Sequence, residues 1–233
     1  MVYIVPPNVK RNIRIIIISS ILLGLVLIIN AVVSGYLLRE NTIKARMHQL
    51  GTLTVILTEH TSQTIFSAKT ALESIEDVVE ISKIKNEDDY RRFATQKNQF
   101  DLLREKVTSN TIIDVATFVG KNGEVLNFSR SFPAPKIDLS ERDYFKWLST
   151  HDDPEVFLSL PVQNKGNGKW VFYLAKRING AKNEFLGVIL VGVSVEVFSR
   201  LYERIGINLG AGSSITLYRN DYHLLTRWPF VDN

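Results

Sequence analysis

The sequence predicts an α+β fold that follows an N-terminal membrane anchor, with an antiparallel sheet of five strands. An uncharged apolar run opens the chain, a long helical pattern follows it, and the remainder alternates between short strands, tight turns and helices. The 233 residues suffice for one or two domains with a hydrophobic core. The absence of cysteine excludes disulfides and cysteine-ligated metal sites.

Residues 15–38 are the predicted transmembrane helix. They carry no charge, and about 20 apolar residues suffice to span the hydrocarbon core of a bilayer. A cleaved signal peptide is the alternative, but its apolar region is normally only about 7–15 residues long. Lys10, Arg11 and Arg14 precede the run, with no acidic residue before it. The positive-inside rule therefore places residues 1–14 in the cytoplasm and the rest of the chain outside.

The net charge of +4 is mainly a signal of membrane topology. Three basic residues precede the apolar run, which leaves 28 − 3 = 25 Lys and Arg against 24 Asp and Glu in the rest of the chain. A nearly neutral exported part gives no indication of nucleic-acid binding. The predicted partners are therefore the lipid bilayer, through residues 15–38, and not nucleic acid.

Residues 39–110 are predicted to form a helical stalk and the helical layer of the domain. A long first helix, which ends near Ser82, contains no proline and a single glycine. Its apolar side chains recur every seven residues, as at Ile43, Leu50 and Leu57. The helix either packs along its own domain or pairs with the same helix of a second subunit in a homodimer. The sequence leaves both interpretations open.

Residues 111–207 form the predicted sheet domain. The Asn-Gly pair within Lys121–Glu124 favours a tight hairpin turn, because both residues tolerate positive φ. Ser140 is a candidate N-cap for a short helix. The expected strands are 111–119, 125–130, 155–162, 169–178 and 185–195, and the expected helices of the exported part beyond the stalk are 87–109, 140–148 and 196–207.

Four strings in these segments carry a resemblance to a known family: ERDYF at 141–145, WVFYLAKRI at 170–178, FLGVIL at 185–190 and GSSITLYRND at 212–221. They resemble the extracytoplasmic dCache sensor domains of bacterial signalling receptors, which are PAS-like. Such strings are typical of the membrane-distal module in the N-terminal sensors of diguanylate cyclases and histidine kinases. The resemblance covers residues 15–233.

The resemblance implies that residues 111–207 are a PAS-like module that binds a small ligand. Residues 208–233, with a hairpin of strands 214–219 and 223–227, would then begin a second, membrane-proximal module. In this family a second span and a cytoplasmic output domain follow, and no GGDEF, EAL or kinase motif occurs here. The resemblance therefore implies either a truncated receptor or a short gene product. It also implies an incomplete second module, no enzymatic activity in this chain and no cofactor.

The segment around Arg142 is the first candidate for a ligand site. The guanidinium of Arg142 suits a carboxylate, Tyr144 offers a hydroxyl, and Trp147 offers an aromatic wall. The alternative is that the aromatic residues only anchor the helix while Arg142 pairs with a nearby acid. Related sensors bind organic acids or amino acids around the matching Arg and Tyr, so the resemblance favours the functional interpretation.

The strand 169–178 supplies the other candidates, because its side chains alternate between two faces. If one face is open, Tyr173 and Arg177 contribute to the site; if the other is open, Lys176 and Trp170 do. The alternative for each cation is surface charge at the end of a strand. The sequence does not decide between the two faces.

The ligand class is narrowed by a departure from the family pattern. Amino-acid-binding members carry an aspartate on the last strand of the sheet, where this chain has Gly192, and their Arg-x-x-Trp-Tyr spacing is missing. The expected ligand is thus an organic acid or an amine rather than an ordinary α-amino acid. Ligand-dependent closure of the Arg142 region would shift the long helix. The alternative function is a ligand-free, anchored interaction or dimerisation module.

Overall fold

The computed structural model describes residues 7–210 and 212–230, and the chain divides into two units, residues 1–59 and 60–233. Residues 1–6 of the predicted cytoplasmic segment, residue 211, and residues 231–233 of the predicted second module lie outside the described residues. The domain boundaries expected from the sequence remain predictions.

The described residues of the first unit form the N-terminal part of the helix α1, Pro7–Ile81. Its most apolar window of 18 residues has a mean hydropathy of 2.9, and none of that window is buried. Two serines of the apolar run bond within the helix: the Ser19 hydroxyl donates to the Ile16 carbonyl oxygen at 2.9 Å, and the Ser34 hydroxyl donates to Asn30 Oδ1 at 3.2 Å. The predicted long apolar helix is confirmed, and by length and composition it can cross a membrane.

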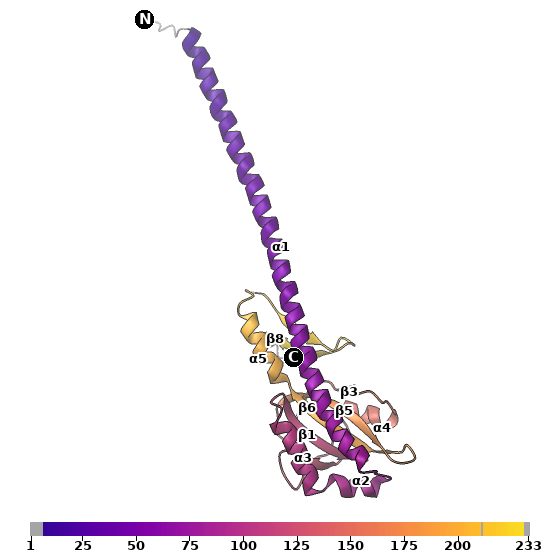
Figure 1. Ribbon diagram of the computed structural model, residues 1–233. Coiled ribbons are helices and arrows are strands. Elements are labelled where there is room, and N and C mark those ends of the chain that lie inside the picture. Colours follow the sequence, from indigo (N-terminus) through magenta and orange to yellow (C-terminus); the bar gives the residue numbers. More distant parts are fainter. Residues whose placement is uncertain (1–6, 211, 231–233) are drawn as a thin grey trace. The chain divides into compact units, whose positions relative to one another are not determined.

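The second unit is built on a mixed helix-and-sheet core, and its main sheet is antiparallel, as predicted (Figure 1). The strand order is β2-β1-β6-β5-β3, and β4 also pairs with β5. The strand β6 is buried except at its two end residues, and the adjacent β5 is buried over 171–175 and at Ile178. The strands are β1 Ile113–Gly120, β2 Val125–Phe128, β3 Phe157–Leu158, β4 Val162–Gln163, β5 Trp170–Asn179 and β6 Phe185–Ser194.

One predicted strand, 155–162, is interrupted, so the sheet has six strands rather than five. At the interruption the buried Ser159 hydroxyl accepts from the Tyr173 amide and donates to the Leu160 carbonyl oxygen, both at 2.8 Å. The Leu160 amide donates to the Asp143 carboxylate at 2.9 Å instead of to β5. Pro161 has no amide hydrogen to offer. The ladder therefore breaks between β3 and β4.

The predicted helix 87–109 is also divided, into α2, Glu87–Ala94, and α3, Lys97–Thr108. The cause is a residue distant in sequence, the fully buried Asn127 of β2. Its side-chain amide donates to the Ala94 and Gln96 carbonyl oxygens at 2.7 and 2.9 Å. These bonds stabilise the non-helical connection between α2 and α3 and satisfy its backbone acceptors.

Helices cover both faces of the sheet. The C-terminal part of α1 packs through a stripe of buried side chains, Ala68, Leu72, Ile75 and Val79, which have helical spacing. This part of the long helix thus packs along its own domain. The helix α5, Val195–Gly206, lies on the same face, where Phe198 contacts Phe172 of β5 with ring centroids 5.8 Å apart.

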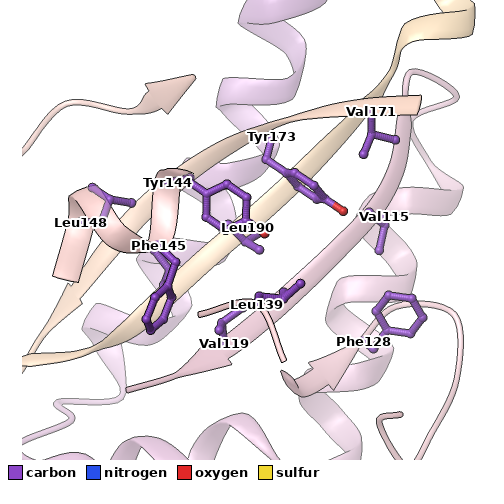
Figure 2. Packing of buried hydrophobic residues seen from close by; sticks show 12 residues of the cluster. Val115, Val119, Phe128, Leu139, Tyr144, Phe145, Leu148, Val171, Tyr173 and Leu190 are labelled. Atoms are coloured by element: carbon purple, nitrogen blue, oxygen red, sulfur yellow. The ribbon is translucent and has the colours of Figure 1, made fainter. Parts of the chain in front are cut away.

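The helix α4, Asp143–Thr150, packs on the opposite face, which we call the α4 face. Figure 2 shows its hydrophobic cluster between α4 and the strands. The cluster contains Val115, Val119, Phe128, Leu139, Tyr144, Phe145, Leu148, Val171, Tyr173, Ala175, Val188 and Leu190. The helix predicted over this face is present. The space between it and the sheet, where a ligand pocket was expected, is lined by core side chains.

A separate hairpin follows α5, with the strands β7, Ile215–Tyr218, and β8, Leu224–Trp228. It contacts α5 closely, because a Cβ on Gly206 would lie 2.1 Å from the Trp228 ring. Its Arg219 guanidinium donates to the Leu158 carbonyl oxygen at 2.6 Å. The hairpin expected from the sequence is confirmed, while its assignment to a second module remains a prediction.

Candidate ligand-binding site

Three of the predicted site residues meet on the α4 face: Arg142, Tyr144 and Tyr173. The two tyrosine rings, from α4 and β5, contact each other with centroids 5.3 Å apart (Figure 2). Tyr144 is fully buried and Tyr173 is 5% exposed. Arg142 lies immediately before the first residue of α4. The face of β5 that carries Tyr173, rather than the face that carries Lys176, therefore joins the Arg142 segment.

Asp143 fixes the start of α4, and Ser140 does not cap the helix as predicted. The cap position is occupied by Arg142 with extended backbone angles, and its side chain makes no capping bond. The Ser140 amide and hydroxyl instead bond to the Asp138 carboxylate at 2.8 and 3.0 Å. The Asp143 carboxylate accepts from the Tyr144 amide at 2.8 Å and from Leu160, so it ties the start of α4 to the β3–β4 connection.

The two tyrosine hydroxyls are neutral donors. Burial raises the pKa of Tyr173 to about 12, against the opposing effect of the Arg142 and Arg130 guanidiniums. Burial also raises the pKa of Tyr144, which the nearby Tyr173 raises further. Among the described residues, the buried Tyr144 hydroxyl has no hydrogen-bond partner. A buried hydroxyl without a partner is costly, so this oxygen is available to a bound molecule.

Arg142 is only partly satisfied by the protein. One of its terminal nitrogens donates to the Gln163 carbonyl oxygen at 2.9 Å. Its buried Nε finds no partner within the part of the chain that the structure describes. A guanidinium has five N–H donors and no acceptor, so the free donor suits an anion.

The structure adds a group that the sequence analysis missed, around Arg130 at the end of β2. Arg130 forms an ion pair with the Asp114 carboxylate and donates to the Asp114 carbonyl oxygen at 3.1 Å. The buried Asn164 amide donates to the same carboxylate at 3.4 Å. The Arg130 Nη1 is buried and, within residues 7–210 and 212–230, unpartnered. The predicted hairpin pairing of 111–119 with 125–130 was the one signal that could have placed Arg130 near Asp114.

We call Asp114, Arg130, Arg142, Tyr144, Asn164 and Tyr173 the polar cluster. Burial is the main cause of the raised pKa of Tyr173; the Arg142 and Arg130 guanidiniums oppose it, and the Asp114 carboxylate adds to it. Two neighbouring residues connect Arg142 to the Arg130–Asp114 pair. The Gln163 carbonyl oxygen accepts from Arg142, and the Asn164 amide donates to the Asp114 carboxylate.

The remaining predicted residues lie elsewhere. Lys176 is on the opposite face of β5, where its ammonium lies 2.9 Å from the Glu76 carboxylate of α1. Arg177 is on the α4 face, but it donates to the Leu148 carbonyl oxygen at 2.6 Å and lies over the Phe185 ring. Arg177 thus anchors the C-terminal end of α4. Both cations also line a cavity of about 400 Å³ whose wall includes Glu76 and Asp152.

Trp147 lies on the outer side of α4 and is 43% exposed. Its ring stacks on His151 with centroids 3.7 Å apart. It lines a second cavity, of about 390 Å³, together with Phe157, Arg219 and His223. Trp147 therefore does not meet the polar cluster. In the described part of the chain no three His, Asp or Glu side chains are grouped as metal ligands.

The chain is similar to solved sensor domains. It is 27% identical to the extracellular domain of rpHK1S-Z16, which is named as a histidine kinase, over 76% of this chain and 68% of that one, with a TM-score of 0.61. It is 14% identical to the ligand-binding domain of the Pseudomonas aeruginosa PAO1 amino-acid chemoreceptor PctC, which was crystallised with GABA. That match covers 76% of this chain and 73% of the other, with a TM-score of 0.53.

No family model and no curated protein sequence matches the chain. Both structural relatives are sensor domains rather than catalytic domains, which fits a non-enzymatic sensing module. The N-terminal apolar helix is long and apolar enough to cross a membrane, and the similar histidine-kinase domain is described as extracellular, which fits a membrane-anchored protein with an outward-facing domain. The chain thus has the fold of the Cache-type extracytoplasmic sensor domains of histidine kinases and chemoreceptors, as its sequence predicts.

Proposed function

We propose that the chain is a membrane-anchored sensor that binds a small organic acid or amine at the polar cluster. The observation that carries this proposal is a group of buried polar atoms without partners among the described residues. Five such atoms occur there, and three of them, Arg130 Nη1, Arg142 Nε and the Tyr144 hydroxyl, belong to the polar cluster. Buried polar groups are nearly always hydrogen-bonded in folded proteins. A cluster of exceptions on one face therefore favours a site whose partner is a ligand.

The proposed topology places residues 1–14 in the cytoplasm and the second unit outside. Lys10, Arg11 and Arg14 support this orientation through the positive-inside rule. Apolar side chains such as Ile43, Met47 and Leu50 remain exposed on α1 at 47–68%. We expect them to pair with the same helix of a second copy, so that the sensor is a homodimer.

The proposed signal passes through β5. Tyr173 contributes to the polar cluster on one face of this strand, and three residues later Lys176 pairs with Glu76 of α1 on the other. A ligand that moves Tyr173 would therefore displace the strand that holds α1. We expect the output domain to be that of a histidine kinase or a diguanylate cyclase.

A second candidate is a ligand-free interaction module. It is favoured by the side chains that fill the α4 face, because Tyr144, Tyr173 and Leu190 belong to one hydrophobic cluster there. In this case the polar cluster would serve only to position α4. The two candidates differ in a single measurable property, the binding of a small molecule.

The test is a thermal-unfolding screen of the full chain in detergent micelles against short-chain organic acids and amines. We expect at least one compound to raise the melting temperature, and Arg142→Ala to weaken its binding at least ~10-fold, about 1.4 kcal/mol. Arg104→Ala, at an exposed position of α3, is the matched control. If a well-folded chain responds to no compound, the ligand-free module is supported. Equal binding by Arg142→Ala would show that the site lies elsewhere.

A further inference from the structure

The interruption between β3 and β4 is held by two elements that lie far apart in the sequence. The Leu160 amide donates to the Asp143 carboxylate at the start of α4, at 2.9 Å. The Leu158 carbonyl oxygen accepts from Arg219 of the β7–β8 hairpin, at 2.6 Å. We infer that residues 158–160, which we call the junction, couple α4 energetically to the hairpin. The inference goes beyond the proposed function, because this coupling needs no ligand.

The two contacts use consecutive peptide units of the chain. The Ser159 amide donates to the Tyr173 carbonyl oxygen of β5 at 2.9 Å. The N–H and C=O groups of one trans peptide unit point in opposite directions. The Leu158 carbonyl oxygen, which belongs to the same unit, therefore faces away from β5 at the edge of the sheet, where Arg219 donates to it. The next peptide unit supplies the amide that donates to α4.

The junction has little freedom to absorb a displacement. The fully buried Ser159 hydroxyl accepts from the Tyr173 amide and donates to the Leu160 carbonyl oxygen, both at 2.8 Å. Pro161 confines the backbone of the residue before it to extended conformations. A shift of the Leu160 amide should therefore also move the Leu158 carbonyl group, instead of being lost in a flexible loop.

Arg219 makes the hairpin's contact with a guanidinium of fixed orientation. Its Nε donates to Asp221 Oδ1 at 2.8 Å, and its Nη2 pairs with the other oxygen of the same carboxylate. This two-point contact leaves Nη1 for the Leu158 carbonyl oxygen. Hydrogen bonding to Asp221 raises the pKa of Arg219, against the effect of burial, so the guanidinium stays charged. Its side chain is only 18% exposed, and a charge-assisted bond is stronger than a neutral one.

Asp143 divides its carboxylate between α4 and the junction. One oxygen accepts from the Tyr144 amide in the first turn of α4, at 2.8 Å, and the other accepts from the Leu160 amide. A movement of this turn therefore changes the geometry of both bonds. Asp143 and Arg219 also line the same cavity, of about 390 Å³, so the two contacts of the junction face one space.

A second attachment of the hairpin defines how it can move. The Thr226 hydroxyl of β8 lies 3.2 Å from the Ser199 hydroxyl of α5, and the Trp228 ring lies close to Gly206 of the same helix. The strand β8 is thus held on α5, while Arg219 holds the turn after β7 at the edge of the main sheet. We expect a displaced junction to tilt the hairpin about its attachment to α5.

Hydrogen exchange of the full chain in detergent measures the coupling in both directions. Arg219→Met should speed amide exchange in residues 157–163 and in the first turn of α4 at least ~3-fold. Asp143→Asn should speed exchange in the hairpin by at least ~3-fold as well. An asparagine offers one acceptor oxygen where an aspartate offers two, so it cannot keep both bonds. In the Arg219→Met background, Asp143→Asn should have no further effect on the hairpin, because the contact that connects them is already lost.

Two control variants match these changes away from the junction. Asp138→Asn alters a carboxylate that bonds to the Ser140 amide and hydroxyl just before α4. Arg227→Met removes a guanidinium at an exposed position of β8. We expect the first to leave exchange in the hairpin unchanged, and the second to leave it unchanged in α4. The buried amides of β6 are the internal reference for an intact fold.

The coupling is overturned if Asp143→Asn loosens α4 but leaves the hairpin unchanged, or if the controls act as strongly as the junction variants. The opposite direction is a separate requirement, because an energetic coupling is reciprocal. Unchanged exchange in residues 157–163 and α4 of Arg219→Met would therefore overturn it too. If Asp143→Asn also loosens β6, the fold itself is affected, and Arg219→Met alone decides.

Discussion

Two buried tyrosines, Tyr144 and Tyr173, should make the stability of the folded chain depend on pH. Tyr144 and Tyr173 lie in the hydrophobic cluster of the α4 face, and burial raises the pKa of both hydroxyls. Removing a phenol proton there would create a charge in an apolar surrounding. The neutral forms therefore stabilise the folded state and also act as donors in the proposed site.

The pH dependence of stability should reveal this burial. The pKa of Tyr173 is about 12 in the folded chain and 10.0 in an ordinary environment. The folded state thus holds its proton more tightly, so the stabilisation is complete below pH 10 and is lost as the pH rises toward 12. We expect Tyr173→Phe to lose less stability than wild type between these pH values, by on the order of 3 kcal/mol, in guanidinium unfolding.

The control for this measurement is Tyr222→Phe. Tyr222 is 88% exposed in the β7–β8 turn, so removing its hydroxyl should not change the alkaline slope. An identical slope for wild type and Tyr173→Phe would show that Tyr173 is not protected from water.

Two glycines of β6, Gly187 and Gly192, lie where a larger side chain would collide with neighbouring elements. Gly187 has a φ of +154°, and a Cβ there would lie 2.1 Å from the Val119 carbonyl oxygen and 2.7 Å from the Tyr90 ring. Gly192 on the same strand meets only side chains, Val115 at 2.8 Å and Tyr173 at 2.9 Å. The first obstacle is a backbone atom in the sheet, while the second can move by a small rotation.

Two glycine variants of β6 should therefore differ in stability. Gly187→Ala adds backbone strain to a clash with the main chain, so we expect it to cost more than about 3 kcal/mol. Gly192→Ala should cost roughly 1–3 kcal/mol, which is typical of overpacking. Urea unfolding of the two variants measures both values. Equal costs would contradict the difference between backbone and side-chain obstacles.

At the scale of the whole molecule, β5 connects the candidate site to the long helix. The Lys176 and Glu76 side chains are only 21% and 15% exposed, and their charged atoms lie 2.9 Å apart. The pair is shielded from solvent on the face where α1 packs. It is therefore a direct polar link between the sheet and the helix that continues into the apolar run.

A double-mutant cycle with Lys176→Met and Glu76→Gln measures this link. We expect a coupling energy of roughly 1–3 kcal/mol in chemical unfolding, because the partners are partly buried. The pair Lys146–Glu141 is the control, with 59% and 82% exposure at 2.6 Å. It should couple by only about 0–1 kcal/mol. A Lys176–Glu76 coupling no larger than the control would remove the basis for a signal through β5.

The features that the sequence predicted well are those that depend on neighbouring residues. The apolar run, the helical spacing of Leu72 and Ile75, and the turn at Asn122-Gly123 each need only a few adjacent side chains to be recognised. The predicted helix, strand and hairpin types are accordingly confirmed. The placement of Arg142, Tyr144 and Tyr173 in one ligand site remains a prediction, although the structure brings the three together.

The sequence by itself determined the anchor, the α+β class, the antiparallel sheet and the resemblance to sensor domains, because hydrophobic periodicity and turn residues are local. The tertiary structure decided where elements break and which side chains meet. Asn127 bonds to the chain between α2 and α3, the Leu160 amide donates to Asp143, and Lys176 pairs with Glu76 of α1. These contacts join residues far apart in the chain, and their energies depend on burial, which exists only after folding.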